Sequence, residues 1–256
     1  MLRSFLLYLS EQDALRNLMT RYSLGRRLAG RFIAGEEIED AVRSHISVKL
    51  TQLGLAIDEA LASRNLEAIC ERAARYGNFV RIDMESSAHT DATLRVFRAV
   101  NAPRQVLGIV IQAYLYRSQK DVDDLLSCGT RIRLCKGAYK EPPDIAFPRK
   151  AEVDANFVKL MENLLASGYD HAIASHDSRM IAATLNFARA RGIGADRFEF
   201  QMLYGIRRRL QRDLLRKGYR VRVYVPYGRQ WYPYFMRRLA ERPANLLFLV
   251  KNLFRG

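Results

Sequence analysis

The sequence lacks three features: paired cysteines, a long apolar run and the common nucleotide-binding motifs. Its three cysteines (Cys70, Cys128 and Cys135) are odd in number and are not spaced as CxxC, so we expect no structural disulfides and a reduced, cytoplasmic protein. No stretch reaches the roughly 18 apolar residues of a membrane span. The first residues, MLRSFLLYLSEQDALRNL, include acidic residues soon after a short apolar run, which predicts an amphipathic helix and not a signal peptide.

The chain has the length, the apolar content and the charge of one large basic domain. Its 256 residues match the roughly 250 that are typical of a (β/α) barrel, and its 49% hydrophobic residues are too many for a disordered protein. The formal charge of +15 would suit nucleic acid or an anionic membrane surface. However, the basic residues are scattered along the whole chain without a tail or a block. We therefore expect no nucleic-acid partner and interpret the charge as an arginine-rich composition.

Five glycines separate helical runs from apolar segments. A glycine just past a helix end can adopt the left-handed conformation that ends many helices. Together with ISVKL and VLGIVIQAY, the segments that follow these glycines give seven predicted strands, and no hairpin signal such as Asn-Gly interrupts them. Alternating strands and helices predict a parallel α/β fold. The glycines are Gly77 before FVRIDM, Gly129 before RIRLCKG, Gly168 before HAIASHD, Gly192 before FEFQML and Gly218 before RVRVYVPY.

The predicted strands are apolar on one face only, whereas a parallel strand buried on both faces is apolar throughout. In a barrel, one face of each strand points to the helices and the other to the lumen, and the site lies at the C-terminal ends of the strands. We therefore predict a (β/α)8 TIM-type barrel with a polar site at its mouth. The apolar face carries Val80, Ile82, Met84, Phe198, Phe200, Met202, Val221, Val223 and Val225, and the polar face carries Lys49, Arg81, Asp83, Gln112, Arg133, His176, Glu199, Gln201, Arg222 and Tyr224.

Cationic residues near the strand ends predict an anionic ligand. Lys49, Arg133 and Lys136 lie at such positions, and arginine binds a carboxylate or a phosphate bidentately. Lys49 or Lys136 could alternatively form a Schiff base with a carbonyl substrate. Because no GxGxxG or GxxxxGK[ST] loop occurs, any nucleotide cofactor must be held by the barrel mouth itself.

A second basic pair lies in WYPYFMRRLAER, which we predict to be a helix after the last strand. Glu241 follows Arg237 by four residues and Arg238 by three, so it can pair with either on one helical surface. Taken alone, this pattern is also that of an ordinary solvated helix face. His171 and His176 would point to opposite faces of a strand, and we expect no metal site.

Eight motifs in a fixed order resemble those of the proline dehydrogenase family, in particular its monofunctional bacterial members. They extend from about Ile46 to Phe254, and the earlier RFIAGE is also similar to the family. The motifs are SVKLTQLGL, RIDMESSAHT, IQAYLYRS, RLCKGAYKE, ASHD, FEFQMLYG, VRVYVPYG and WYPYFMRRLAERPAN.

This resemblance implies the oxidation of L-proline to Δ1-pyrroline-5-carboxylate, with FAD as cofactor and a membrane quinone as electron acceptor. It implies that one group of residues in the matching motifs binds the substrate or holds the substrate-binding side chains in place. These residues are Lys49, Asp83, Leu203, Tyr224, Arg237, Arg238 and Glu241. It implies that a second group contacts FAD, with Arg133 near the flavin N5: Gln112, Arg133, Lys136, Gly137, Ala138, His176 and Gln201.

The chain departs from the family near residue 43. The family has a further strand and helices between the RFIAGE segment and the SVKLT strand, whereas Ala41-Val42-Arg43 here runs almost directly into Ser44-His45-Ile46. At least one βα unit of more than about 30 residues is therefore absent. We predict an N-terminal helical segment at residues 1–44, followed at residues 45–256 by an incomplete barrel of seven strands that lacks the first.

An open barrel exposes strand edges, which invite pairing with another chain. The N-terminal residues could fill the opening, the seven strands could close on themselves, or a partner chain could cover it. The missing unit also supports a second hypothesis, a catalytically degenerate homologue that binds a flavin or a partner. A third hypothesis, compatible with proline oxidation, is peripheral contact of the basic surface and of a helix at Phe5 to Leu9 with the inner face of the membrane.

Overall fold

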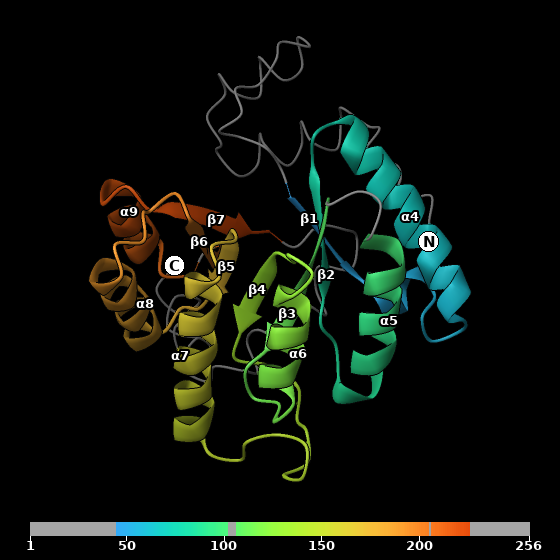
Figure 1. Cartoon of the computed structure of the whole chain (residues 1–256), viewed down its shortest axis with the longest axis horizontal. Helices are drawn as coiled ribbons and strands as arrows, with labels where there is room; N and C mark the ends of the chain where they lie inside the picture. Colours follow the sequence, from blue (N-terminus) through green and yellow to red (C-terminus); the bar gives the residue numbers. More distant parts are fainter. Residues whose placement is uncertain (1–44, 102–105, 205, 226–256) are drawn as a thin grey trace, which may run out of the picture.

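Seven parallel strands alternate with helices in the computed structural model, which describes residues 45–101, 106–204 and 206–225. The strands form one curved sheet, and the helices lie along its outer side (Figure 1). The predicted helical segment at residues 1–44, together with Arg237, Arg238 and Glu241, lies outside the described residues. The strands are β1 His45–Lys49, β2 Phe79–Asp83, β3 Leu107–Gln112, β4 Ile132–Cys135, β5 His171–Ala174, β6 Phe198–Leu203 and β7 Arg220–Tyr224. The α-helices are α4 Glu59–Arg75, α5 Thr90–Asn101, α6 Ser118–Leu126, α7 Lys150–Ala166, α8 Ser178–Ala190 and α9 Arg208–Arg216.

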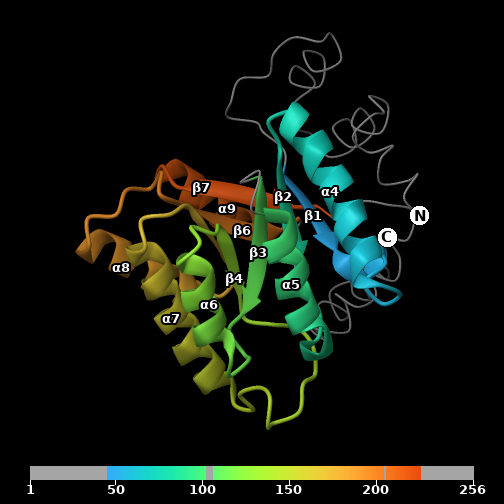
Figure 2. The same ribbon diagram turned by 45° about the vertical axis from the view of Figure 1, so that its right-hand side comes forward.

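Each strand pairs in parallel with the next one along the chain, in the order β1 to β7. The register places Lys49 beside Asp83 and Leu203 beside Tyr224. Within the described residues no ladder joins β7 to β1, so the sheet is a barrel that does not close (Figure 2). The prediction of seven parallel strands is confirmed, and closure of these strands on themselves does not occur in this part of the chain.

The connections from helix to strand use the five predicted glycines. All of them have positive φ angles, between 60° and 82°, which a residue with a Cβ adopts only at a cost. Helix starts are specified by aspartates: Asp58 accepts a hydrogen bond from the Leu61 amide at 2.9 Å, and Asp177 caps α8. Local sequence signals therefore set the helix ends.

The outer face of the sheet packs against the helices in one apolar core. Val80 and Ile82 of β2 and Phe200 of β6 are fully buried there, together with Phe157 of α7. This burial confirms the predicted apolar face, and each such side chain contributes about 1.5–3 kcal/mol. Val223 is 38% exposed, because β7 has a neighbouring strand on one side only among the described residues.

The two outer strands should lose protection first in native-state hydrogen exchange. The outer edges of β1 and β7 have no ladder partner among the described residues, whereas β3, β4 and β5 are paired on both sides. We expect amides of β1 and β7 to exchange faster than those of β4, because exposed edges open locally. Equal protection would contradict this and indicate that N-terminal residues or a second chain cover the edges. Dependence on protein concentration would then distinguish the second chain.

Candidate functional site

An ion pair between Arg133 and Asp83 lies at the centre of the lumen. Only 8% of Arg133 and 9% of Asp83 is exposed, and Arg133 Nη2 donates to Asp83 Oδ1. The other oxygen, Asp83 Oδ2, accepts a hydrogen bond from the Tyr224 hydroxyl at 3.1 Å and lies 3.8 Å from Lys49 Nζ. The structure thus brings four of the predicted site residues, from β1, β2, β4 and β7, together around one carboxylate.

The guanidinium of Arg133 is held in place from several strands. Its Nη1 donates to Ser47 Oγ of β1 and to Gln201 Oε1 of β6, both at 3.1 Å. Its Cζ also lies 5.5 Å from the centre of the Tyr224 ring, a cation–π distance. Sequence reasoning missed Ser47, since a serine within a strand gives no signal of its partner.

A second ion pair in the lumen joins Glu199 of β6 to Arg222 of β7. Arg222 Nε and Nη2 donate to the two carboxylate oxygens at 2.8–3.1 Å, and Gln201 Nε2 donates to Glu199 Oε1. Although burial acts in the opposite direction, the hydrogen bond and charge of Arg222 lower the pKa of Glu199. Both residues lie on the predicted polar face, but neither is among the predicted site residues.

The lumen carries more positive than negative charge. Arg81 is 4% exposed and donates to the carbonyls of Ile109 and Arg131, both at 3.3 Å. Burial and the neighbouring Arg133 lower the pKa of Arg81 to about 9, so it stays charged at neutral pH. The positive excess suits an anionic ligand such as a carboxylate. The cations are Lys49, Arg81, Arg133 and Arg222, and the anions are Asp83 and Glu199.

Lys136, directly after β4, is held by two carboxylates. Its Nζ donates to Asp177 Oδ2 at 2.8 Å and to Asp154, and Lys150 and Arg179 reach the same carboxylates. Burial opposes the shift, but these hydrogen bonds raise the pKa of Lys136. A raised pKa opposes a Schiff-base role, which needs a neutral amine. Three cations against two carboxylates leave one positive charge for a ligand.

The ends of β1, β2 and β3 are joined by Gln112 and Glu85. Gln112 Nε2 donates to the Glu85 carbonyl at 2.7 Å, and the Glu85 carboxylate accepts from Thr51 N at 3.0 Å and Thr51 Oγ1 at 2.7 Å. The predicted cofactor residue Gln112 is therefore held by the backbone of Glu85, and the carboxylate of Glu85 is itself held by Thr51. Sequence reasoning missed Glu85. Glu85 lies just past a strand end, and that position was its only signal.

The loop after β4 packs closely across the mouth. Gly137 has a φ of 111°, and a Cβ at this position would clash with the Tyr114 ring, so only glycine fits. Glu141, further along the loop, accepts hydrogen bonds from Ser87 N at 2.7 Å and Ser87 Oγ at 2.5 Å. Gly137 and Ala138, both predicted cofactor residues, thus lie in a loop that packs against Tyr114 and is hydrogen-bonded to Ser87.

His176 and Leu203 meet where β5 and β6 end. His176 Nε2 accepts a hydrogen bond from Leu203 N at 2.8 Å, and the His176 carbonyl accepts from Arg207 Nη1 at 2.8 Å. His171, on β5, accepts from Ile132 N at 3.1 Å. Both histidines therefore make structural hydrogen bonds, and His176 is near the site.

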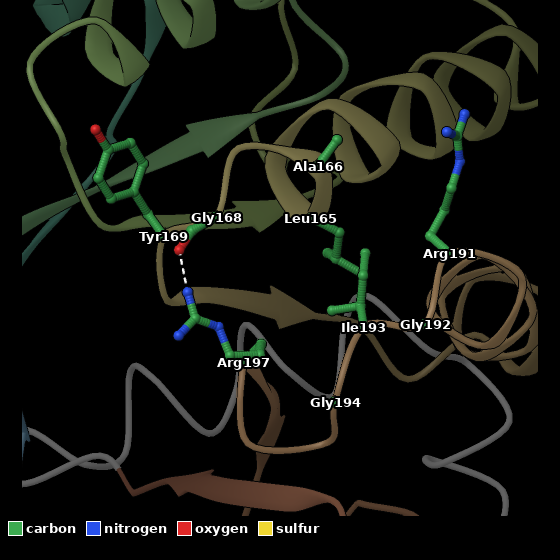
Figure 3. A pocket seen from close by; sticks show the side chains of 9 residues that line it. All are labelled: Leu165, Ala166, Gly168, Tyr169, Arg191, Gly192, Ile193, Gly194 and Arg197. Carbon is green, nitrogen blue, oxygen red and sulfur yellow. Dashed lines mark hydrogen bonds between the residues drawn. The ribbon is translucent and has the colours of Figure 1, made fainter.

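A separate pocket of about 430 Å³ lies at the opposite end of the sheet. Its walls are the loops before β5 and β6, and Arg197 Nη2 closes one side by donating to the Gly168 carbonyl. Figure 3 shows Leu165 and Ile193 between these loops, with the Arg191 and Tyr169 side chains directed away from them. None of the predicted site residues lines this pocket, and the lumen remains the candidate site.

Comparisons with known proteins match the chain to one family. The "Proline dehydrogenase" family profile matches residues 9–251. Proline dehydrogenase 2 of Bacillus subtilis (strain 168) is 46% identical over 215 residues, which cover 84% of this chain and 71% of that relative. Proline dehydrogenase 1 of the same strain is 39% identical over 303 residues, with both chains covered completely. Among solved structures, proline utilization A from Bdellovibrio bacteriovorus has a TM-score of 0.70 and 31% identity; the match covers 75% of this chain and 24% of that chain.

The full-length comparison agrees in size with the predicted missing unit. The alignment with Proline dehydrogenase 1 has 303 positions, whereas this chain has 256 residues, so 47 positions have no counterpart here. A βα unit of more than about 30 residues fits within that number.

Replacing Asp177 with alanine should lower stability at neutral pH and much less in acid. The hydrogen bond from Lys136 holds the pKa of Asp177 well below its usual range. The stabilisation is therefore present above pH 3.8, the ordinary value, and is lost as the pH falls through the lower folded value. Loss of this helix cap alone costs about 1 kcal/mol, which corresponds to about 2–4 °C in Tm.

The measurement is the Tm of the wild type and of Asp177→Ala at about pH 7 and about pH 2, because most of the loss occurs well below pH 3.8. Asp213→Ala is the control, since it removes an exposed ion pair with Arg216, which is worth little. An Asp177→Ala effect that was the same at both pH values would contradict the prediction.

Proposed function

The chain belongs to the proline dehydrogenase family, and from this premise we propose that it oxidises L-proline to Δ1-pyrroline-5-carboxylate with FAD as its cofactor. Family membership identifies it as an oxidoreductase of the proline dehydrogenase type. The observation that carries the finer proposal is the cationic lumen built around the buried Arg133–Asp83 pair. A small zwitterion with a carboxylate matches that charge.

The proposed substrate residues lie on one side of this lumen. Lys49, beside Asp83, pairs with the proline carboxylate, and Asp83 and Tyr224 keep each other and Lys49 in place. Leu203, next to Tyr224 in the register, provides an apolar surface for the ring. The proposal also assigns Arg237, Arg238 and Glu241 to this group, and these three lie outside the described residues.

The proposed cofactor residues fit a large anionic group. Arg133 and Gln201 are buried in the lumen, and the Lys136 cluster retains one positive charge. The glycine at 137 lets the backbone of the loop pack closely against the Tyr114 ring at the mouth. Gln112 ends β3 and His176 follows β5, on either side of β4, which carries Arg133. The full proposed set is Gln112, Arg133, Lys136, Gly137, Ala138, His176 and Gln201.

These residues act by orientation and by charge. FAD, when bound, supplies the acceptor for the hydride that leaves C5 of proline. Lys49 fixes the substrate carboxylate, so that the ring can lie in one orientation only, which is catalysis by positioning. Arg133 places a fixed positive charge at the site that receives the electrons, where it stabilises the negative charge that develops. Leu203 and Tyr224 exclude water from one side of the ring.

A catalytically degenerate homologue is the second candidate. It is favoured by the open sheet, in which no ladder joins β7 to β1 among the described residues, and by the 47 alignment positions without a counterpart. Such a protein would keep the lumen residues but fail to hold the cofactor or the substrate.

An anaerobic titration with L-proline separates the two candidates. We expect the purified wild-type protein to show a flavin absorption band that bleaches when L-proline is added. Lys49→Met should need about 10–100 times more proline for the same bleaching, because a hydrogen bond between charged groups is worth about 1.5–3 kcal/mol. The control is Lys217→Met, which removes an exposed lysine before β7 and should titrate like the wild type. A protein that takes up no FAD, even when FAD is supplied, would support the degenerate homologue.

We further propose that electrons pass to a membrane quinone and that the protein contacts the membrane peripherally. None of the helices in the described residues is long and apolar enough to span a bilayer. Helix α9 offers a basic surface beside the mouth: Arg208, Arg209 and Arg212 are exposed and make no ion pair with any described residue, and Leu215 is 54% exposed. Basic residues near an anionic bilayer contribute about 1 kcal/mol each.

Vesicle sedimentation tests this contact. We expect binding to vesicles with anionic lipid at low salt, release at high salt, and weaker binding after Arg208, Arg209 and Arg212 are all replaced by glutamine. Neutral vesicles are the control. Absence of binding, or binding that salt does not change, would contradict the proposal, and activity with a soluble dye would be unaffected by either result.

A further inference from the structure

Glu199 and Arg222 form the support behind Arg133, and no predicted role accounts for them. Glu199 of β6 is 8% exposed and binds Arg222 of β7 through three contacts of 2.8–3.1 Å. The same carboxylate accepts from Gln201 Nε2, and Gln201 Oε1 in turn accepts from Arg133 Nη1 at 3.1 Å. A continuous chain of hydrogen bonds therefore runs from Arg222 to Arg133.

We propose that Glu199 and Arg222 are positioning residues that fix Gln201 and, through it, Arg133 for hydride transfer. This inference rests on the proposed function, in which Arg133 lies beside the flavin. Neither residue belongs to the proposed substrate-binding or cofactor-binding residues, but Glu199 contacts one of them, Gln201. Their effect is carried by the side-chain amide of Gln201.

The two ends of the Gln201 side-chain amide bind different kinds of partner. A glutamine side chain has an acceptor oxygen and a donor nitrogen, and its orientation is set by its neighbours. Arginine is a donor only, so Arg133 requires the oxygen of Gln201 to face it. An ionised carboxylate is an acceptor only, so Glu199 requires the nitrogen to face the other way. Glu199 therefore selects the one orientation of Gln201 that binds Arg133.

Arg222 keeps Glu199 ionised. A buried carboxylate without a partner would take up a proton, and a protonated Glu199 could donate to Gln201 and allow the amide to turn. The bidentate contact from Arg222 favours the ionised form. The charge of Glu199 also acts on Arg81 and His45, since it opposes the lowering of the pKa of both. Among the described lumen-facing strand residues, Asp83 is the other carboxylate, and it is already engaged by Arg133.

A purely structural role is the alternative, because the pair also ties β7 to its one neighbouring strand. The two roles differ in what they change. A structural tie affects the Tm, whereas positioning of Arg133 affects the flavin and the turnover while leaving proline binding intact. Asp170 and Arg220 provide a matched control, since this ion pair of 3.4 Å also involves β7 but lies outside the chain of hydrogen bonds.

The experiment compares Glu199→Gln with Asp170→Asn in the FAD-loaded protein. For Glu199→Gln we expect a lower flavin reduction potential and a kcat lower by on the order of 10-fold to 100-fold, with the KM for proline unchanged. Asp170→Asn should leave potential, kcat and KM as in the wild type. Arg222→Lys, which keeps a cation for Glu199, should retain more activity than Arg222→Met.

A Glu199→Gln protein with wild-type potential and kcat, changed only in Tm, would overturn the inference. If that variant does not fold, the comparison of Arg222→Lys with Arg222→Met decides, and equal potentials and kcat values for these two would also overturn it. The wild type is measured first. Failure of the wild type to bind FAD would refute the proposed function itself, whereas a wild type that turns over beside an unaffected Glu199→Gln refutes only the positioning role.

Discussion

The buried Arg133–Asp83 pair imposes the main physical constraint on this protein. A charge taken out of water costs several kcal/mol unless it is paired and its remaining hydrogen-bonding groups are satisfied. Here they are satisfied by Ser47, Gln201 and Tyr224. These partners come from three further strands, so the pair is stable only in a sheet curved enough to bring all of them to one place. Removing one partner of such a pair costs about 3–5 kcal/mol.

The same network compensates for the opening in the sheet. No ladder connects the first and last described strands, but side chains connect them through the lumen. The Tyr224 hydroxyl reaches Asp83 across 141 positions of sequence, and Arg133 reaches Ser47 across 86. Contacts between the side chains of the lumen thus do part of what backbone hydrogen bonds do in a closed barrel. Substrate and cofactor of the proposed reaction would use the same cations, so ligand binding and these contacts across the lumen depend on the same side chains.

Much of the fold could be predicted because its signals are local. A glycine with positive φ ends a helix wherever it occurs, and alternation of apolar and polar residues marks a strand with two different faces. Both signals lie within a few residues, and the glycines preceded five of the seven strands that the structure shows. Val223 lies on the predicted apolar face but is exposed, because β7 has no outer neighbour among the described residues. No pattern within the strand carries that information.

The sequence by itself determined the parallel α/β fold, the polar inner face and, through its motifs, the family. It also identified Lys49, Asp83, Arg133 and Tyr224, which meet in the lumen. Only the tertiary structure decided which groups pair: Arg133 with Ser47, Glu199 with Arg222, and Lys136 with Asp154 and Asp177. The physical reason is distance. Hydrogen bonds and ion pairs act over a few ångströms, and which strands come that close depends on the curvature and stagger of the sheet, not on any segment of sequence.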